Sequence, residues 1–540
     1  MNIQTVKTQP IEGQKPGTSG LRKKTKVFMQ PHYLANFVQS IFDGIGGVQG
    51  KTLVVGGDGR FFNDTATKTI LRMMAAQGAS KALIGQNALL STPAASHLIR
   101  LNETDGGIIL SASHNPGGED EDFGIKFNMP NGGPAPEAIT DAIFEQTTTI
   151  TSYDILESDE VDLSTIGSTR LGGMEIEVVD PVDAYVDLMQ SLFDFPSIKA
   201  MIHGGAKLRL DAMCAVTGPY AKRIIEDILG AKGAVTHGTP LPDFGGMHPD
   251  PNPTWAHELM AEMMGEDAPD FGCASDGDGD RNMVVGPNCY VSPSDSLAII
   301  AANAHHAPGY KDGLKGVARS MPTSAAVDRV AVAKGMRCYE TPTGWKFFGN
   351  LMDDGRVSLC GEESFGTGSD HVREKDGVWA ILMWLNIMAA TGKSVPQLMA
   401  DHWAEFGRNY YTRHDFEAIE SEKADAMMQH LRKEVTELKG RKFGALTVDW
   451  ADDYSYTDTV DRSVSAHQGI RIVFEGGSRF VVRLSGTGTS GATVRLYLEK
   501  FDSKSFDLDP QDAVANVLSA AQEIMQLEHF TGRTKPDVLT

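Results

Sequence analysis

Residues 106–118 read GGIILSASHNPGG, and the rest of the chain is organised around this stretch. A short β-branched run bounded by glycine predicts a buried strand over 106–110, and Asn-Pro-Gly-Gly at 115–118 predicts a turn. Ser113 therefore follows the end of a strand, which is where open α/β sheets hold their ligands. Alone, the motif also fits an ordinary serine in a polar turn, so the remaining segments must decide.

Strands and helices alternate around this stretch, which is typical of an α/β protein with mostly parallel strands. The patterns predict helices over 33–43, 64–77, 378–390 and 418–438, and strands within 52–60, 81–85, 123–127, 208–213, 479–484 and 492–498. Residues 147–178 are polar and irregular, and we expect a long connection there. A length of 540 residues favours three or four domains. We place them at 1–187, 188–292, 293–407 and 408–540.

The composition is that of an acidic globular protein. The 71 Asp and Glu residues outnumber the 49 Lys and Arg residues, and the net charge of −22 argues against nucleic acid and anionic membranes as partners. Five scattered cysteines include no CxxC pair, which indicates reduced thiols rather than a disulfide or zinc framework. The chain also lacks a membrane-length apolar run and a signal-peptide apolar region, so we expect a cytoplasmic enzyme, monomeric or weakly dimeric.

Residues 276–281, Asp-Gly-Asp-Gly-Asp-Arg, carry the strongest chemical signal. In an extended segment Asp276, Asp278 and Asp280 share one face, where three carboxylates repel one another unless a cation holds them. Oxygen ligands alone indicate Mg²⁺ or another hard metal. A calcium EF-hand is excluded because Arg281 stands where that loop needs glycine. Arg281 also suits the charge on a transferring phosphoryl group. A plain acidic turn is the alternative.

Several other segments contain cationic, carboxylate or hydroxyl side chains. Arg22 ends a glycine-punctuated loop and suits bidentate phosphate binding, whereas Lys126 lies on the polar face of the strand over 123–127. Lys375 precedes an apolar helix and is a candidate proton carrier or phosphate contact. The loop 361–366, GEESFG, offers carboxylates and a hydroxyl of the kind that bind sugar hydroxyls. Each segment is also compatible with a solvated surface turn.

Residues 485–491, SGTGTSG, satisfy the G-x-G-x-x-G dinucleotide fingerprint. We reject that interpretation because the fingerprint needs a following helix, whereas residues 492–498 alternate like a strand. Small residues with exposed backbone amides, flanked by Arg483 and Arg495, favour an anion-binding cup instead. A tight hairpin with solvated arginines is the alternative.

These sites together favour a phosphomutase. A phosphatase needs one phosphate site, and a kinase needs a nucleotide site, for which the chain has no Walker A sequence. Here a candidate nucleophile, a metal site and a distant phosphate cup suit a ligand with phosphate at both ends. The serine phosphate would pass to one oxygen, the ligand would turn round, and the other phosphate would return to the serine.

Ten segments across the chain resemble the α-D-phosphohexomutase family, and its glucose-selective long-chain branch in particular. They are GTSGLRKK (17–24), VVGGDGRF (54–61), SASHNPGG (111–118), FGIKFN (123–128), NGGPAPEAITD (131–141), DGDGDRNM (276–283), ETPTGWKFFGNLMD (340–353), LCGEESFGTGSDH (359–371), REKDG (373–377) and RLSGTGTSGATVRLYLE (483–499).

The resemblance implies an α/β protein of four domains in a heart-shaped arrangement around a cleft. Three would be related α/β units with mixed sheets, and the C-terminal one a TBP-like α+β domain. In order, they would carry the phosphoserine, the metal, the sugar site and the phosphate site. The implied reaction interconverts α-D-glucose 1-phosphate and glucose 6-phosphate through a phosphoserine enzyme and glucose 1,6-bisphosphate. Mg²⁺ is the implied cofactor and small sugar phosphates are the partners.

The resemblance also assigns individual residues. Ser113 matches the phosphorylated nucleophile, and its phosphate oxygen would join Asp276, Asp278 and Asp280 around Mg²⁺. Lys375 matches a general acid or base. The other matching positions are the cations Arg22, His114, Lys126 and Arg281, the sugar-loop residues Thr343, Gly344, Glu362 and Ser364, and the phosphate-cup residues Arg483, Ser485, Gly486, Thr487, Gly488, Thr489 and Arg495.

Two departures from the family pattern stand near Ser113. Ser111 replaces the usual threonine, and the acidic run at 119–122 replaces a neutral Pro-Asn-Gly. We expect these carboxylates either to slow turnover or to tune metal affinity. There are two alternative functions. One is a phosphohexomutase that prefers another hexose such as mannose, and the other is a non-catalytic phosphoprotein with the same fold.

Overall fold

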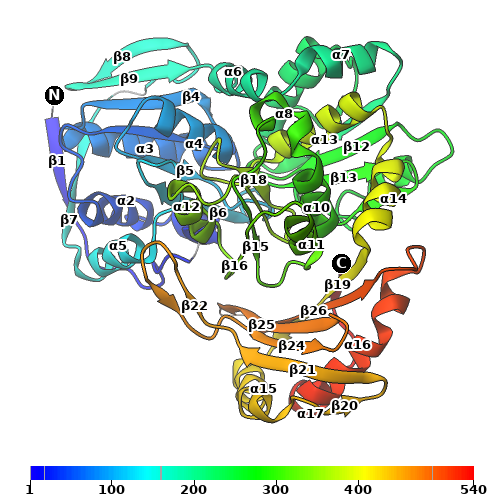
Figure 1. Cartoon of the computed structure of the whole chain (residues 1–540). Helices are drawn as coiled ribbons and strands as arrows, with labels where there is room; N and C mark the ends of the chain where they lie inside the picture. The colour runs from blue at the N-terminus through cyan, green and yellow to red at the C-terminus, as the bar shows by residue number, and fades with distance from the viewer. Residues whose placement is uncertain (1, 18, 159–160, 489–490) are drawn as a thin grey trace.

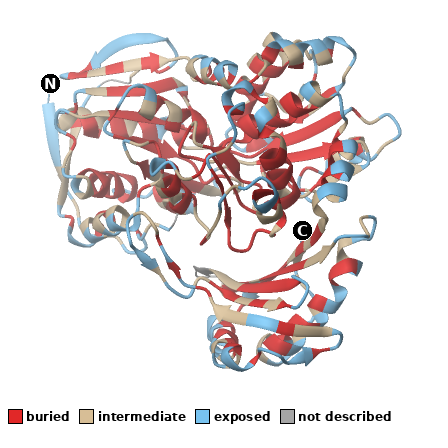
Figure 2. Ribbon diagram, viewed as in Figure 1, coloured by how far each residue is buried: buried red, intermediate tan, exposed pale blue. Residues whose placement is uncertain are grey.

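The computed structural model describes residues 2–17, 19–158, 161–488 and 491–540, and four main sheets organise it (Figure 1). Three sheets with their helices form one body, and the fourth lies beneath it in this view. Figure 2 shows buried segments gathered inside the upper body and exposed segments around its rim. The four-unit α/β architecture with mixed sheets is therefore confirmed, while the exact boundaries at 187, 292 and 407 stay predictions.

The first sheet contains the strand that leads to Ser113. Its order is β2 (Leu21–Lys24), β6 (Asp122–Asn128), β5 (Gly107–Leu110), β3 (Thr52–Gly57), β4 (Lys81–Leu89), β9 (Met174–Val179) and β8 (Gly167–Leu171). Strands β5, β3, β4 and β9 run parallel. Alternate residues of β3 face opposite sides, so Leu53 and Val55 pack in one apolar cluster and Val54 packs in another. The carboxyl ends of β3 and β5 thus meet at one edge, next to Ser113.

Helices cover both faces of this first sheet. They are α1 (Thr25–Phe28), α2 (Tyr33–Gly44), α3 (Asn63–Ala76), α4 (Thr92–Leu101) and α5 (Glu137–Thr149). Residues of α2 and α3 pack with Leu53 and Val55, whereas residues of α4 pack with Val54. The two-sided packing explains why every residue of β5 is buried.

The second and third sheets share one apolar core. The second is β11 (Val235–Thr236), β10 (Leu208–Asp211), β12 (Phe271–Ser275), β13 (Asn282–Gly286) and β14 (Cys289–Val291); the third is β16 (Cys338–Thr341), β15 (Val317–Ser320), β17 (Leu359–Gly361) and β18 (Thr367–Ser369). Helix α13 (Gly377–Thr391) packs against β12, β13 and β18 and is buried from Gly377 to Met388. Its tryptophans are core residues as predicted, and each indole N–H donates to a buried hydroxyl.

The remaining helices of these two units surround that core. They are α6 (Asp183–Leu192), α7 (Phe195–His203), α8 (Thr217–Ala221), α9 (His257–Met263), α10 (Pro293–Asn303), α11 (Ala326–Ala333), α12 (Trp345–Asp353) and α14 (Val395–Phe406). Among the described residues, no single helix has the length and apolarity to span a membrane, although α13 and α14 meet that test as a pair bent by 83°. All five cysteines are free.

The fourth sheet is antiparallel throughout. Its order is β20 (Lys442–Phe443), β21 (Leu446–Asp453), β24 (Ile470–Phe474), β25 (Arg479–Gly488), β26 (Gly491–Asp502), β19 (Arg408–Ile419) and β27 (Val538–Leu539). Helices α15 (Ser421–Glu434) and α16 (Pro510–Met525) pack on one face in a single apolar cluster. The other face of β25 and β26 looks toward the upper body (Figure 1).

Two predicted segments were wrong. Within 147–178, which was expected to be irregular, the structure forms β7 (Ser152–Glu157), β8 and β9, and β7 pairs with β1 (Asn2–Lys7). The helix predicted over 418–438 begins only at Ser421, because residues 418 and 419 still belong to β19. In both places pairing with a distant strand decides the structure, and the local sequence pattern does not show that pairing.

A buried histidine predicts how the fold responds to acid. His402 of α14 is 5% exposed, and burial lowers its pKa to about 4. The unfolded chain therefore binds a proton at residue 402 below pH 6.5 that the folded chain does not bind. His402 alone lowers the free energy of unfolding by about 1.4 kcal/mol per pH unit between pH 6.5 and 4. Urea titrations should show a shallower loss over this range for His402→Gln. Equal slopes for the two proteins would contradict the prediction.

Candidate active site

A closed ring of hydrogen bonds holds the Ser113 loop. The backbone N–H of Ser113 donates to Ser111 Oγ at 2.7 Å, and Ser111 Oγ donates to Asp58 Oδ2 at 2.7 Å. Asp58 forms a fully buried ion pair with Arg60, whose Nη2 donates to the Ser113 carbonyl at 2.8 Å. This ring supports Ser113 at φ +53°, a left-handed backbone conformation that residues other than glycine rarely adopt.

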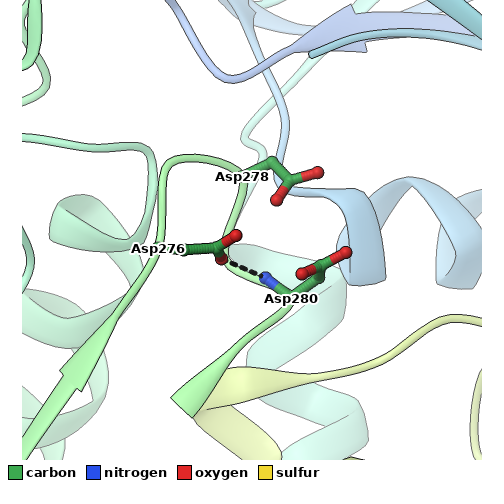
Figure 3. A group of neighbouring side chains, drawn as sticks. All are labelled: Asp276, Asp278 and Asp280. Carbon is green, nitrogen blue, oxygen red and sulfur yellow. Dashed lines mark hydrogen bonds between the residues drawn. The ribbon is translucent and has the colours of Figure 1, made fainter. Parts of the chain in front are cut away.

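The three aspartates lie in a turn rather than on an extended segment, so that part of the prediction was wrong. Gly279 has φ +79°, and Asp276 Oδ1 accepts the N–H groups of Asp280 and Arg281 at 2.9 and 3.1 Å. The turn nevertheless brings one oxygen from each aspartate within 4.8 Å of the others. Figure 3 shows the three carboxylates converging on the same side of the turn.

This cluster has the chemistry of a metal site. One oxygen each of Asp278 and Asp280 is buried without a hydrogen-bond partner, while the other oxygen of Asp278 accepts from Thr92 at 2.7 Å. Burial and the two neighbouring carboxylates raise the pKa of Asp276 well above its usual range. Three buried carboxylates that converge, two of them with an oxygen that lacks a hydrogen-bond partner, fit a hard divalent cation.

The cluster lies against the nucleophile candidate. Ser113 Oγ donates to Asp276 Oδ2 at 3.0 Å, across 163 residues of sequence. His114 Nδ1 lies 3.4 Å from the same Oγ. Burial and the nearby cations, first Arg281 and then Arg22, lower the pKa of His114 well below its usual value. This histidine is therefore neutral at pH 7 and able to hydrogen-bond without adding charge.

Lysines flank the metal cluster. Lys375 Nζ lies 3.1 Å from Asp280 Oδ2, and Lys126 Nζ donates to Glu374 at 2.8 Å. Burial is the largest single influence and lowers the pKa of Lys375, but the carboxylates of Asp280, Glu362 and Asp276 together outweigh it, so the net pKa lies above the usual value. Sequence reasoning missed Glu374, which is buried and also accepts from Asn128 at 2.9 Å.

Two arginines add positive charge to this region, and Arg22 is the first of them. Its Nε is buried without a hydrogen-bond partner, and burial lowers its pKa. Arg281 contacts Asp250 at 3.5 Å and Asp276 at 3.9 Å. Two arginines directed at the Ser113 region make the local positive field that an acidic protein needs to bind phosphate.

A cavity of about 170 Å³ joins the predicted sites. Residues from all four predicted domains line it, including Ser113, Asp278, Glu362 and Arg495. The predicted residues Arg22, Lys126, Asp280, Arg281, Thr343, Gly344, Ser364 and Lys375 also line it. Glu362 accepts the N–H of Gly344 at 3.1 Å, which ties the two sugar loops together.

The phosphate cup is only partly described. Gly486, Thr487 and Gly488 continue the backbone of β25, and Thr489 lies outside the described residues. The following segment is strand β26, which confirms the rejection of a dinucleotide site. Among the described residues, Arg483 and Ser485 do not line the cavity, and Arg483 instead donates to the carbonyl of Gln468 at 3.3 Å.

The acidic run beside the catalytic loop is largely paired. Lys24 lies 3.1 Å from both Glu121 and Asp122, and Lys26 pairs with Asp120. These exposed pairs offset much of the charge that distinguishes this loop.

Family models match nearly the whole chain. They are the alpha/beta/alpha domains I, II and III of phosphoglucomutase/phosphomannomutase, at residues 13–154, 183–288 and 293–406, and the C-terminal domain of phosphoglucomutase-1 at 408–537. The chain is 57% identical over 541 residues to a phosphoglucomutase of Rhizobium radiobacter, with both proteins covered completely. This protein belongs to the phosphoglucomutase family.

Other relatives agree with this assignment. The chain is 50% identical to phosphoglucomutase 1 of Drosophila melanogaster, with both proteins covered completely. The open form of the phosphoglucomutase pp63/parafusin from Paramecium superposes with a TM-score of 0.93 at 47% identity, over 100% of this chain and 99% of that one. Membership of the phosphoglucomutase family thus rests on the entire length of the chain.

Proposed function

We propose that the protein is a phosphoglucomutase that interconverts α-D-glucose 1-phosphate and glucose 6-phosphate. A phosphoserine at 113 and a glucose 1,6-bisphosphate intermediate would carry the reaction. The observation that supports this most is the single cavity lined by Ser113, Asp278, Glu362 and Arg495. A nucleophile, metal ligands, a sugar-binding carboxylate and a distal arginine suit a ligand with a phosphate at either end.

Mg²⁺ is the proposed cofactor, held by Asp276, Asp278 and Asp280 together with an oxygen of the serine phosphate. When bound, it would neutralise charge on the transferring phosphoryl group. The chain's own part is to orient Ser113 Oγ toward Asp276 and to surround the phosphoryl oxygens with Arg22, Arg281 and Lys126. Catalysis of phosphoryl transfer is mainly positioning and electrostatic stabilisation, and buried cations supply both.

The reaction consists of two transfers through Ser113. First a sugar hydroxyl oxygen attacks the phosphorus of phosphoserine, and the bond from phosphorus to Ser113 Oγ breaks. The bisphosphate then turns round, and Ser113 Oγ attacks its other phosphate, which releases the bridging sugar oxygen. Each transfer takes one proton from the attacking hydroxyl and gives one to the leaving oxygen, which is Ser113 Oγ in the first transfer and the bridging sugar oxygen in the second. We propose that Lys375 donates the proton to the leaving oxygen and recovers one from the attacking hydroxyl. Its raised pKa keeps it protonated at pH 7, ready to donate.

The remaining residues position the two ends of the substrate. Thr343, Gly344, Glu362 and Ser364 would bind the sugar hydroxyls, and the cup at 485–495 would bind the phosphate farther from Ser113. We also propose a cytoplasmic, monomeric protein. Because Lys24 and Lys26 pair with the acidic run, that run does not favour a non-catalytic role.

A coupled assay tests the function directly. Glucose 6-phosphate should form from glucose 1-phosphate only with Mg²⁺, and catalytic amounts of glucose 1,6-bisphosphate should stimulate it. The value of kcat/KM should be higher for glucose 1-phosphate than for mannose 1-phosphate. Absence of turnover, or a preference for mannose 1-phosphate, would contradict the proposal.

The hydrogen-bond ring predicts the effect of a substitution at Ser111. Ser111→Ala removes the acceptor for the Ser113 N–H and the donor to Asp58, so the nucleophile loses support for its left-handed backbone. We expect kcat to fall by about tenfold or more, because a small misplacement of the reacting atom is costly. Ser111→Thr keeps the hydroxyl and should retain activity. Steady-state kinetics of both variants measure this effect, and a wild-type kcat in Ser111→Ala would contradict the prediction.

A further inference from the structure

A buried carboxylate lies behind the arginine at the far end of the cavity. Asp415 is 3% exposed, and on β19 it lies directly opposite Arg495 of β26. Its Oδ2 is 3.6 Å from Nε of Arg495, and its Oδ1 is 3.1 Å from Nε of Arg413. Asp415 does not line the cavity among the described residues, whereas Arg495 does. The carboxylate therefore contacts Arg495 from outside the cavity lining.

The contact with Asp415 involves only the Nε end of the Arg495 guanidinium. Asp415 approaches Nε, so the two terminal nitrogens of the guanidinium stay available to a phosphate, which they can bind in a bidentate manner. The Arg495 side chain is 32% exposed, and its Nε has no hydrogen-bond partner. It thus has room to move, and charge attraction to Asp415 is what restrains it.

Three cations crowd this face of the sheet. Arg483 of β25 is paired across the sheet with Arg495, and Arg413 lies two residues before Asp415 on the same face of β19. Within the described ion pairs, Asp415 is the carboxylate that contacts Arg413 and Arg495. Without its charge the arginines would repel one another, and Arg495 would turn toward solvent.

The C-terminal segment fixes the backbone that carries Asp415. Strand β27 pairs with β19 at Asp415 and His414. The N–H of Asp537 donates to the Asp415 carbonyl at 2.8 Å, and Arg413 exchanges two backbone hydrogen bonds with Thr540 at 2.7 and 3.0 Å. Paired on both sides, this part of β19 holds the carboxylate in one place relative to β26.

We propose that Asp415 is a positioning residue for the distal phosphate site. It holds the guanidinium of Arg495 at the cavity, where that group receives the phosphate that lies farther from Ser113. The inference rests on the proposed function and adds a residue that acts through Arg495 without touching the substrate.

A double-mutant cycle with Arg495→Met tests the proposal. Asp415→Asn keeps the shape of the side chain and removes its charge. We expect KM for glucose 1-phosphate to rise about tenfold while kcat stays within about twofold, a size usual for coupled neighbouring groups. In an Arg495→Met background, the same Asp415→Asn change should shift KM by less than about twofold, because its target is gone. Glu434→Gln is the matched control, since it breaks an ion pair with Arg441 in the same domain outside the cavity lining.

Several results would overturn the proposal. An unchanged or lowered KM in Asp415→Asn would mean that the carboxylate only opposes phosphate binding. An equal rise in KM in both backgrounds would mean a purely structural role. Asp415→Ser serves the same cycle if circular dichroism shows that the asparagine variant does not fold. A wild-type protein without mutase turnover would instead refute the proposed function.

Discussion

Replacing Ser113 with alanine should reduce turnover of glucose 1-phosphate by at least about 10⁴-fold, because the proposed mechanism passes every phosphoryl group through Ser113 Oγ. The side chain removed is 3% exposed, and its Oγ donates to Asp276. Since one hydrogen bond and a few atoms are lost, the melting temperature should change little. The measurement is steady-state turnover with saturating Mg²⁺ and glucose 1,6-bisphosphate.

A serine outside the site provides the control for this variant. Ser168 lies exposed on β8, and Ser168→Ala should keep full activity. Ser113→Ala protein that is folded and still turns over at the wild-type rate would refute the assignment of the nucleophile.

The second large effect concerns the aspartate cluster. Asp276→Asn keeps an oxygen for the N–H groups of Asp280 and Arg281 but removes one of three buried negative charges. We expect the affinity for Mg²⁺ to fall by about 100-fold, as loss of a charged oxygen ligand from a hard-metal site implies. Activity at a fixed low Mg²⁺ concentration should fall with it.

Stability separates this metal effect from general damage. Mg²⁺ at 100 times its Kd should stabilise the wild type by about 2.7 kcal/mol, whereas the same concentration stabilises a 100-fold weaker site by only about 0.4 kcal/mol. Without metal, the variant should melt at a higher temperature than the wild type, because removing one charge relieves repulsion between buried carboxylates. Thermal melts with EDTA and with Mg²⁺ measure both differences. A variant that melts lower in EDTA and still gains the full Mg²⁺ stabilisation would contradict the proposed ligand.

Local patterns in the sequence predicted the elements that carry the chemistry. The run Ile108-Ile109-Leu110 followed by Ser113 became β5 and the nucleophile loop, because a short apolar β-branched run bounded by glycine has few alternatives. Three acidic residues at alternate positions predicted a cluster of carboxylates that could hold a metal ion. Their turn geometry was missed, because Gly279 reverses the chain where an extended segment was assumed.

Features that depend on distant pairing could not be read from local patterns. Glu374 was missed because its hydrogen-bond partner, Lys126, lies 248 residues away in the sequence. Strand β7 pairs with the distant strand β1, and its short run of mixed polar and apolar residues, SYDILE, does not show that partner. The segment over 174–179 did alternate between apolar and acidic residues, and this signal would have located β9.

In the proposed mechanism, Ser113 carries the phosphoryl group inside a cavity lined by residues of all four domains. Intact-mass analysis with peptide mapping, after incubation with glucose 1,6-bisphosphate and Mg²⁺, tests it most directly. We expect one added phosphoryl group per chain, located on Ser113, and its removal when glucose 6-phosphate is added. No added phosphoryl group, or one located on another residue, would contradict it.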